Sequence, residues 1–176
     1  MTGDEFVTGP HRVDTPHPGL VHALADLWGQ VTIAGGGVGF GPADPVEEVR
    51  AAASSVIDDV AARRAHLITI GRSHELVGAA VLVPGRYPVS RHTAELSLLM
   101  VHPDLWGRGW GRQLVEAAVS QARAIGVEKL ELVARSGAGL EEFYTALGWV
   151  ESGRWPGSVR VAEGDDRDRV WFTRDV

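Results

Sequence analysis

Two segments near the N-terminus carry apolar residues at the spacing of an amphipathic helix. The first runs from Gly19 to Ile33, and the second from Asp44 to Arg64, with Asp44 expected as the N-cap and Pro45 as the first helical residue. Later in the chain, short apolar runs bounded by turn residues predict strands at Leu67–Gly71, Leu76–Val83, Thr93–Val101 and Lys129–Ala134. This order of helices and strands predicts an α/β (α+β) fold around a mixed sheet.

The two ends of the chain are less regular. Residues 1–18 contain prolines and histidines without apolar periodicity, so we interpret them as a lead-in that could form a flexible arm. Residues 19–176 are expected to form one domain. At the C-terminus, Trp149–Trp155 and Asp168–Thr173 predict a last hairpin, with Gly164–Asp168 in its connection.

The segment around Gly107–Arg112 predicts an anion-binding site. An apolar run ends at Val101 and is followed by His102-Pro103, the glycine-alternating loop Gly107–Arg112 and a helical pattern. Glycines let backbone N–H groups approach a ligand closely, and the first turn of a helix supplies unpaired donors and the positive end of its dipole. Arg108 and Arg112 add positive charge. We therefore expect this loop to bind a phosphorylated cofactor.

The loop differs from two common phosphate-binding motifs. It lacks the Gly-Lys-Ser/Thr of a nucleoside triphosphate site, and the sixth position from Gly107 is Arg112, where the dinucleotide motif requires glycine. The alternatives are a Gly/Arg-rich loop without function and an RNA-binding segment. Both are disfavoured, because such segments lack a strand–turn–helix frame.

These residues resemble the pyrophosphate loop of the GNAT family of N-acetyltransferases, Gln/Arg-x-x-Gly-x-Gly/Ala after a strand that ends Val-x-Pro. Val101-His102-Pro103 and Gly109-Trp110-Gly111 match, whereas Trp106 stands where the family has Gln or Arg. The segment Leu140–Trp149 is similar to the family's fourth-helix signature, Phe/Leu-Tyr-x-x-x-Gly-Phe. The resemblance implies the GNAT fold, a mostly antiparallel sheet of about six to seven strands with about four helices.

The resemblance also implies acetyl-CoA as co-substrate and the residues that hold it. Backbone groups of the strand before the loop are expected to bracket the pantetheine and the acetyl carbonyl, and small residues before the Tyr144 helix to lie beside the pantetheine. Tyr144 corresponds to the family's general acid, which protonates the departing thiolate. The expected cofactor-binding residues are Leu99, Met100, Val101, Gly107, Arg108, Gly109, Trp110, Gly111, Arg112, Ser136 and Gly137.

One subgroup, the tabtoxin resistance acetyltransferases, has three further similar segments. They are Gly35–Phe40, Ala94-Glu95 before Leu99–Val101, and Arg108–Leu114. By this resemblance the acceptor is the amine of a small antimicrobial molecule. The glycine-rich segment would then wall the acceptor pocket, with Gly37 and Phe40 as substrate-binding residues, although a flexible joint is an equally good interpretation of it.

Glu95 is the candidate general base. It is the only carboxylate in its predicted strand, it matches the subgroup's catalytic glutamate, and Ser97 is expected on the same face. The alternative is an ordinary solvent-facing strand residue. Where the subgroup has an aspartate in the next strand, this chain has Val133, so Glu95 is expected to work alone.

Composition narrows the remaining choices. The chain has 176 residues, 44% of them hydrophobic, which suits one globular domain with a sizeable core. The absence of cysteine excludes disulfides and thiolate metal sites, and the seven histidines form no ligand pattern, so no metal is expected. The net charge of −6 argues against nucleic-acid and acidic-membrane partners. Without a membrane-spanning run or signal peptide, we expect a cytoplasmic protein, and a homodimer stays open.

Three functions remain open at this stage. The leading one is a small-molecule amine N-acetyltransferase of the antibiotic-resistance type. The second is a protein or peptide N-acetyltransferase, and the third is an acetyl-CoA-binding module without catalysis. The combination of Tyr144 with Glu95 argues against the third, and nothing in the sequence separates the first two.

Overall fold

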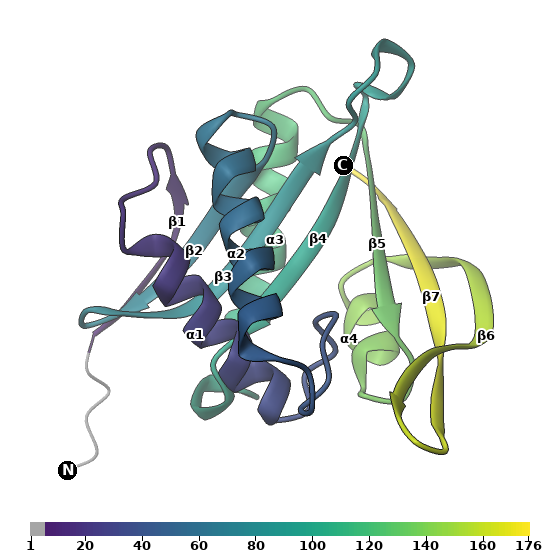
Figure 1. Ribbon diagram of the computed structural model, residues 1–176. Helices are drawn as coiled ribbons and strands as arrows, with labels where there is room; N and C mark the ends of the chain where they lie inside the picture. Colours follow the sequence, from purple (N-terminus) through teal and green to yellow (C-terminus); the bar gives the residue numbers. More distant parts are fainter. Residues whose placement is uncertain (1–5) are drawn as a thin grey trace.

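One seven-stranded mixed sheet runs through residues 6–176, the part of the chain that the computed structural model describes (Figure 1). The strand order is β1-β2-β3-β4-β5-β7-β6, and every neighbouring pair is antiparallel except β4 and β5. The strands are β1 (Val7–Val13), β2 (His66–Arg72), β3 (Glu75–Pro84), β4 (Thr93–Val101), β5 (Lys129–Arg135), β6 (Val150–Ala162) and β7 (Asp165–Asp175). The helices are α1 (Leu20–Ile33), α2 (Val46–Ala61), α3 (Trp110–Ala124) and α4 (Leu140–Ala146), with short 3-10 turns at Pro88–Ser90 and Pro103–Leu105. The predicted fold class is confirmed.

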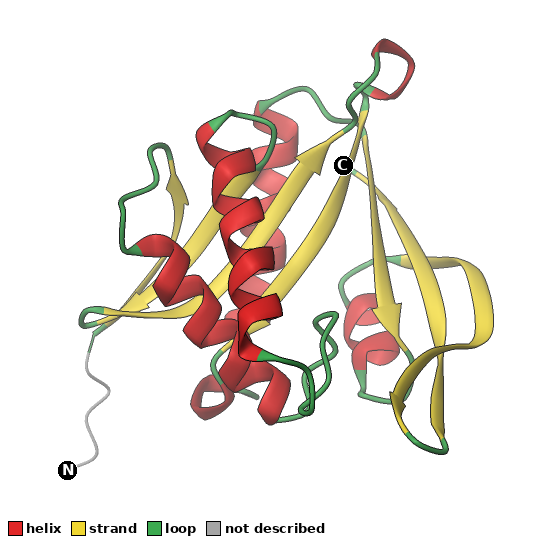
Figure 2. Ribbon diagram, viewed as in Figure 1, coloured by secondary structure: helices red, strands yellow, loops and turns green. Residues whose placement is uncertain are grey.

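The helices cover the two faces of the sheet unequally. In Figure 1, α1 and α2 lie in front of β2, β3 and β4, and α3 lies behind these strands. Each side has its own apolar core, with Leu24 and Leu27 buried on the α1/α2 side and Leu114 and Val115 on the α3 side. Tyr144 of α4 belongs to the second core. The opposite face of β5, β7 and β6 is covered by no helix of the described chain (Figure 2).

Strands β4 and β5 are paired only where they begin. Their register joins Thr93–Glu95 to Lys129–Glu131, and no later pair links them within the described residues. Beyond this point β5 continues beside β7 while β4 stays with β3, so the two strands diverge (Figure 1). The backbone edge of β4 from Leu96 to Val101 is therefore not used by β5, and a gap opens in the sheet.

A β-bulge in β4 accompanies this divergence. Leu96 pairs with Leu82 and Leu98 pairs with Val81, which leaves Ser97 without a register partner on β3. The bulge interrupts the simple alternation of faces, which the expectation that Ser97 shares a face with Glu95 had assumed.

Three local predictions need correction. Residues Val7–Val13 of the expected arm form β1, an edge strand paired with β2, while residues 1–5 lie outside the described chain. Asp44 does not cap α2, because Pro45 holds the N-cap position and the Asp44 carboxylate accepts a hydrogen bond from Gly41 N at 2.7 Å. The last hairpin is longer than predicted, since residues 165–168 belong to β7.

Candidate active site

A cavity of about 780 Å³ occupies the gap between β4 and β5. It reaches from the N-terminus of α3 and from α4, on one side of the sheet, to the glycine loop (Gly35–Gly41) beside α1 on the other side. Its lining residues are Trp28, Val31, Gly35, Gly36, Gly37, Val38, Gly39, Glu95, Leu96, Ser97, Leu98, Leu99, Val101, Leu105, Trp106, Gly107, Gly109, Trp110, Gly111, Arg112, Val133, Ala134, Ala138, Gly139, Leu140, Phe143, Tyr144 and Ala146. The cavity thus brings most of the predicted site residues together.

The Gly107–Arg112 loop forms one end of the cavity. Gly107 and Gly109 have φ values of +73° and +84°, a conformation that glycine adopts at little cost, and a Cβ at either position would point into open space. Gly109 is the N-cap of α3, so the N–H groups of the first turn, which have no intrahelical acceptor, face this end. Together with Arg112 they form a site suited to phosphate groups.

Trp106 has a defined role in this loop. Its indole Nε1 donates a hydrogen bond to the carbonyl oxygen of Val101 at 2.7 Å, and the side chain lines the cavity. The residue therefore ties the loop to the end of β4.

The unpaired edge of β4 forms the middle of the cavity. Leu99 and Val101 line it, whereas Met100 points into the α1/α2 core and is almost fully buried. Arg108 is also outside the lining. Since β5 diverges from β4 here, backbone N–H and C=O groups on this edge of β4 can form hydrogen bonds to an extended chain that lies beside it like an additional strand. A pantetheine arm has the amides for such contacts.

Tyr144 lies in the cavity wall opposite β4. Its side chain is 6% exposed and packs against the rings of Phe143, Trp149 and Phe172. Burial raises the pKa of the phenol, so the hydroxyl keeps its proton over the whole working range. The group can therefore act as a proton donor.

Glu95 lines the cavity at the point where β4 and β5 separate. Its carboxylate is accessible to solvent, yet partial desolvation by the surrounding walls raises its pKa, and the nearby Glu131 carboxylate raises it further. Glu131 is directly opposite Glu95 in the register of the two parallel strands. Sequence reasoning missed this partner, because nothing in the order of residues shows which position of β5 faces Glu95.

The glycine loop is fixed rather than a free joint. The indole Nε1 of Trp28 donates to Val38 O at 2.8 Å, and Arg135 donates to Gly35 O at 2.8 Å. A Cβ on Gly36 would collide with Val31. Gly37 lines the cavity. Phe40 is not in the lining and packs edge-on against Trp28, with 5.5 Å between ring centroids.

Ser136 and Gly137 are not in the cavity lining, whereas the following residues, Ala138 and Gly139, line it. The Ser136 hydroxyl accepts a hydrogen bond from Asp168 N at 2.9 Å, and Gly137 N donates to Glu141 at 3.1 Å. These two predicted cofactor residues are thus anchored to β7 and α4.

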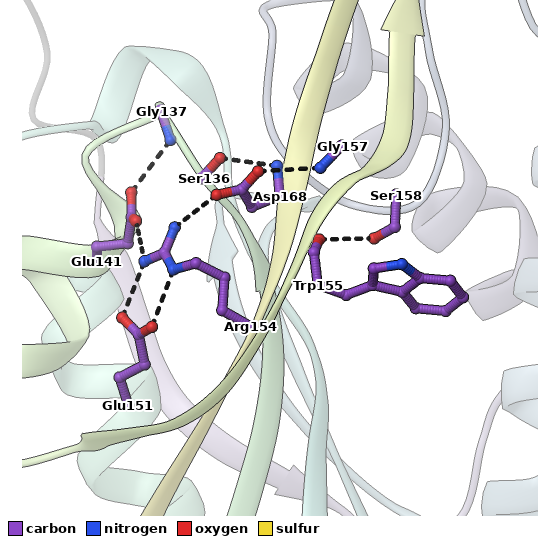
Figure 3. A network of polar contacts seen from close by, with 9 residues as sticks. All are labelled: Ser136, Gly137, Glu141, Glu151, Arg154, Trp155, Gly157, Ser158 and Asp168. Carbon is purple, nitrogen blue, oxygen red and sulfur yellow. Dashed lines mark hydrogen bonds and ion pairs between the residues drawn. The ribbon is translucent and has the colours of Figure 1, made fainter.

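Arg154 joins this anchor to the last hairpin. Its guanidinium lies between the carboxylates of Glu141, Glu151 and Asp168, at 2.8 to 2.9 Å (Figure 3). The hydrogen bonds to Arg154 lower the pKa of all three carboxyl groups. The network holds the loop before α4 against β6 and β7, and with it the wall that Ala138 and Gly139 form.

Two general properties of the described residues complete the picture. Among residues 6–176, no three His, Asp or Glu side chains gather in a way that could hold a metal ion. Within the same range, no helix has both the length and the apolarity needed to cross a membrane.

Comparison with known proteins decides the family. The profile of the acetyltransferase (GNAT) family matches residues 38–149, which include β4, the Gly107–Arg112 loop and α4. The chain belongs to the GNAT family. This result confirms the family resemblance drawn from the loop and the Tyr144 helix, while the tabtoxin resistance subgroup is not resolved by it.

Solved structures show the same fold along nearly the whole chain. A proposed acetyltransferase from Salmonella typhimurium, solved with its cofactor acetyl-CoA, is 16% identical, with a TM-score of 0.72 over 96% of this chain and 94% of that one. A ribosomal-protein-alanine N-acetyltransferase from Brucella melitensis is 17% identical, with a TM-score of 0.72 over 97% and 99%. A proposed phosphinothricin N-acetyltransferase is 15% identical, with a TM-score of 0.76 over 97% and 98%. At these identities the likeness establishes the fold, and membership of the family makes the protein an acetyltransferase.

Proposed function

We propose that this GNAT protein transfers the acetyl group of acetyl-CoA to the amine of a small molecule. The observation that carries the proposal is the cavity that passes through the sheet, with the N-terminus of α3 at one end, Tyr144 in the wall, and Glu95 toward the other end. The glycine loop and its Trp28 and Arg135 contacts close the acceptor side. An acceptor pocket of this kind suits a compact amine.

The reaction needs three contributions from the protein: a base, groups that stabilise the oxyanion, and an acid. The amine nitrogen attacks the thioester carbon, a C–N bond forms, and the C–S bond breaks as the tetrahedral intermediate collapses. Glu95, directly or through water, takes the proton that the ammonium must lose, and partial burial raises the pKa of its carboxyl group, which makes it a stronger base. Free N–H groups on the β4 edge stabilise the oxyanion, and Tyr144 returns a proton to the thiolate.

The acetyl-CoA end of the proposal rests on groups that the structure exposes. The N–H groups at the start of α3 fit the pyrophosphate, and the open edge from Leu96 to Val101 fits the pantetheine amides. The cofactor in the Salmonella relative, which has the same fold, supports this assignment.

A thiol-release assay with acetyl-CoA tests the proposed function. The acceptor panel should contain amino acids, polyamines, aminoglycosides, tabtoxinine-like β-lactams and N-terminal peptides. Release of CoA that depends on a small amine, with the acetylated product identified by mass spectrometry, is the expected result. Acetyl-CoA binding without turnover of any amine would contradict it.

A protein or peptide N-acetyltransferase is the second candidate. The likeness to the Brucella enzyme, whose name specifies a ribosomal protein as acceptor, favours it. The likeness to the proposed phosphinothricin N-acetyltransferase, together with the segments shared with the tabtoxin resistance subgroup, favours a role in resistance to a small antimicrobial. Turnover of N-terminal peptides at higher kcat/KM than every small amine would decide for the peptide enzyme.

A further inference from the structure

The helix-free face of β5, β7 and β6, here called the open face, carries charges in an ordered arrangement. Alternation along the strands turns Leu130, Leu132 and Ala134 of β5 toward the α3/α4 core. The intervening residues Glu131, Val133 and Arg135 therefore belong to the open face. By the same alternation, the open face receives Arg169, Trp171 and Thr173 from β7 and, from β6, Val150 and Trp155.

A pair of like charges lies at each end of this face. At the end where β5 begins, Glu131 is directly opposite Glu95 of β4. At the end where β5 stops, Arg135 is directly opposite Arg169 of β7. Like charges at opposed positions of neighbouring strands destabilise a sheet, so each pair carries an unfavourable energy that a ligand of opposite charge would relieve.

The basic pair is only partly compensated by the protein, because neither arginine has a carboxylate of the described chain in direct contact. Arg135 donates to a neutral carbonyl, Gly35 O, and the Arg169 guanidinium lies 6.0 Å from the centre of the Trp155 ring. Among residues 6–176, neither arginine forms an ion pair with a carboxylate. The nearby carboxylate of Asp165 is hydrogen-bonded to Arg167, and the charge of Arg135 acts on it without direct contact, which helps to lower the pKa of that carboxyl group.

Trp155 points to the open face, away from the side of the hairpin on which Arg154 is paired with carboxylates. Figure 3 shows its indole on the other side of β6 from Arg154, whose charge is matched by three carboxylates. Neighbouring arginines of this hairpin thus differ sharply, because Arg154 is fully paired and Arg169 is not.

An apolar surface connects the two charged ends. Val133, 44% exposed, lines the cavity and pairs in register with Trp171 of β7. Glu131 and Arg135 are four positions apart, which corresponds to about 13 Å along the strand. Arg135 also forms the back of the cavity wall, because a Cβ on Gly37 would lie 3.5 Å from its Nε. Arg135 is therefore at the rim of the acceptor side, and Arg169 is its register partner on β7.

We propose that the acceptor is a primary amine that carries a carboxylate at the other end of its chain. Its ammonium group binds beside Glu95 and Glu131, its apolar stem lies over Val133, and its carboxylate binds between Arg135 and Arg169. This inference rests on the proposed function, of which it names the substrate class.

The test compares acceptors that differ only in the carboxylate. The matched pairs are β-alanine with ethylamine, γ-aminobutyrate with propylamine, and ε-aminocaproate with pentylamine, each assayed by CoA release. For the pair whose length fits, kcat/KM should favour the carboxylated amine by on the order of 10–100-fold, the usual contribution of hydrogen bonds to a charged group. Equal kcat/KM values in all three pairs would overturn the proposal.

Variants then locate the carboxylate. Arg169→Gln should lower the ratio of the two kcat/KM values by on the order of 10–100-fold, and Arg169→Lys should retain part of it. Arg160→Gln is the matched control, because Arg160 lies in the same hairpin, is exposed, and is paired with Asp166. An unchanged ratio in Arg169→Gln would overturn the assignment of the arginine pair.

A thermal-shift measurement with acetyl-CoA separates the two levels of the argument. If acetyl-CoA stabilises the protein and no carboxylated amine is acetylated, the acceptor class is wrong while the cofactor site stands. If acetyl-CoA does not stabilise the protein, the proposed function itself fails.

Discussion

Removal of the Tyr144 hydroxyl tests the chemistry with little structural disturbance. The ring centroids of Phe143, Phe172 and Trp149 lie 5.1, 5.7 and 6.0 Å away, and Tyr144→Phe keeps all three ring contacts. No described residue is a hydrogen-bond partner of the hydroxyl, so none is orphaned. The free energy of unfolding should therefore change by less than about 1.5 kcal/mol, whereas Tyr144→Ala, which removes the ring, should cost about 3–5 kcal/mol.

The effect on turnover should be much larger than the effect on stability. Loss of the proton donor is expected to lower kcat about 10²–10⁴-fold, which equals about 3–5 kcal/mol of activation free energy. The affinity for acetyl-CoA should stay close to that of the parent, because the phosphate site and the β4 edge are untouched.

The assay is steady-state CoA release with saturating amine, together with thermal melts of each variant. Tyr87→Phe is the matched control, since it removes the same hydroxyl from the other tyrosine, which is 64% exposed and outside the cavity lining. A Tyr144→Phe protein with parental kcat would refute the reasoning, and the thiolate would then receive its proton from water.

Three further predictions follow from the same structure. Acetyl-CoA at a hundred times its Kd should stabilise the fold by about 2.7 kcal/mol. Gly109→Val should abolish the corresponding thermal shift, because φ is +84° at this position and the backbone must approach the phosphates. A thermal shift retained in this variant would mean that the phosphates bind elsewhere. Glu131→Gln removes a charge that raises the pKa of Glu95, so the acidic limb of the pH–rate profile should move to lower pH. Glu95→Gln should lose rate near neutrality and recover at high pH. Profiles that are only scaled down would exclude Glu95 as the base. Arg154→Met should lower the melting temperature at neutral pH. The difference from the parent should be smaller in acid, since the three carboxylates lose their ion pairs as the pH falls through their lowered pKa values. A difference independent of pH would mean that packing, not charge, explains the lower melting temperature.

The local pattern of residues was sufficient to predict the helices, the central strands and the Gly107–Arg112 loop, because the conformation of each depends mainly on residues close by in the sequence. The first strand, β1, was not predicted, because its sequence has no local strand pattern. Residues Val7–Val13 contain Pro10 and no apolar alternation, a pattern that sheets tolerate only at an edge, and β1 is the edge of this sheet. Its existence depends on β2, which lies far away in the sequence.

The residues of the candidate site that belong to a local motif were predictable, whereas those whose position depends on strand register were not. Leu99, Gly109 and Tyr144 were identified from motif spacing, and all three line the cavity. Glu131 could not be found in this way, since its position opposite Glu95 is set by how β4 and β5 align in the folded sheet. The bulge at Ser97 was hidden for the same reason, because it appears only when β4 is paired with β3.

The divergence of β4 and β5 has a consequence for inhibition of this protein. The cavity is lined by residues from both sides of the sheet, so under the proposed function the acetyl donor and the amine would enter from opposite sides and be bound at the same time. A conjugate in which CoA is joined covalently to the acceptor nitrogen would thread the gap and be held on both sides at once. Its two halves would each raise the effective concentration of the other, so it should bind far more tightly than either alone.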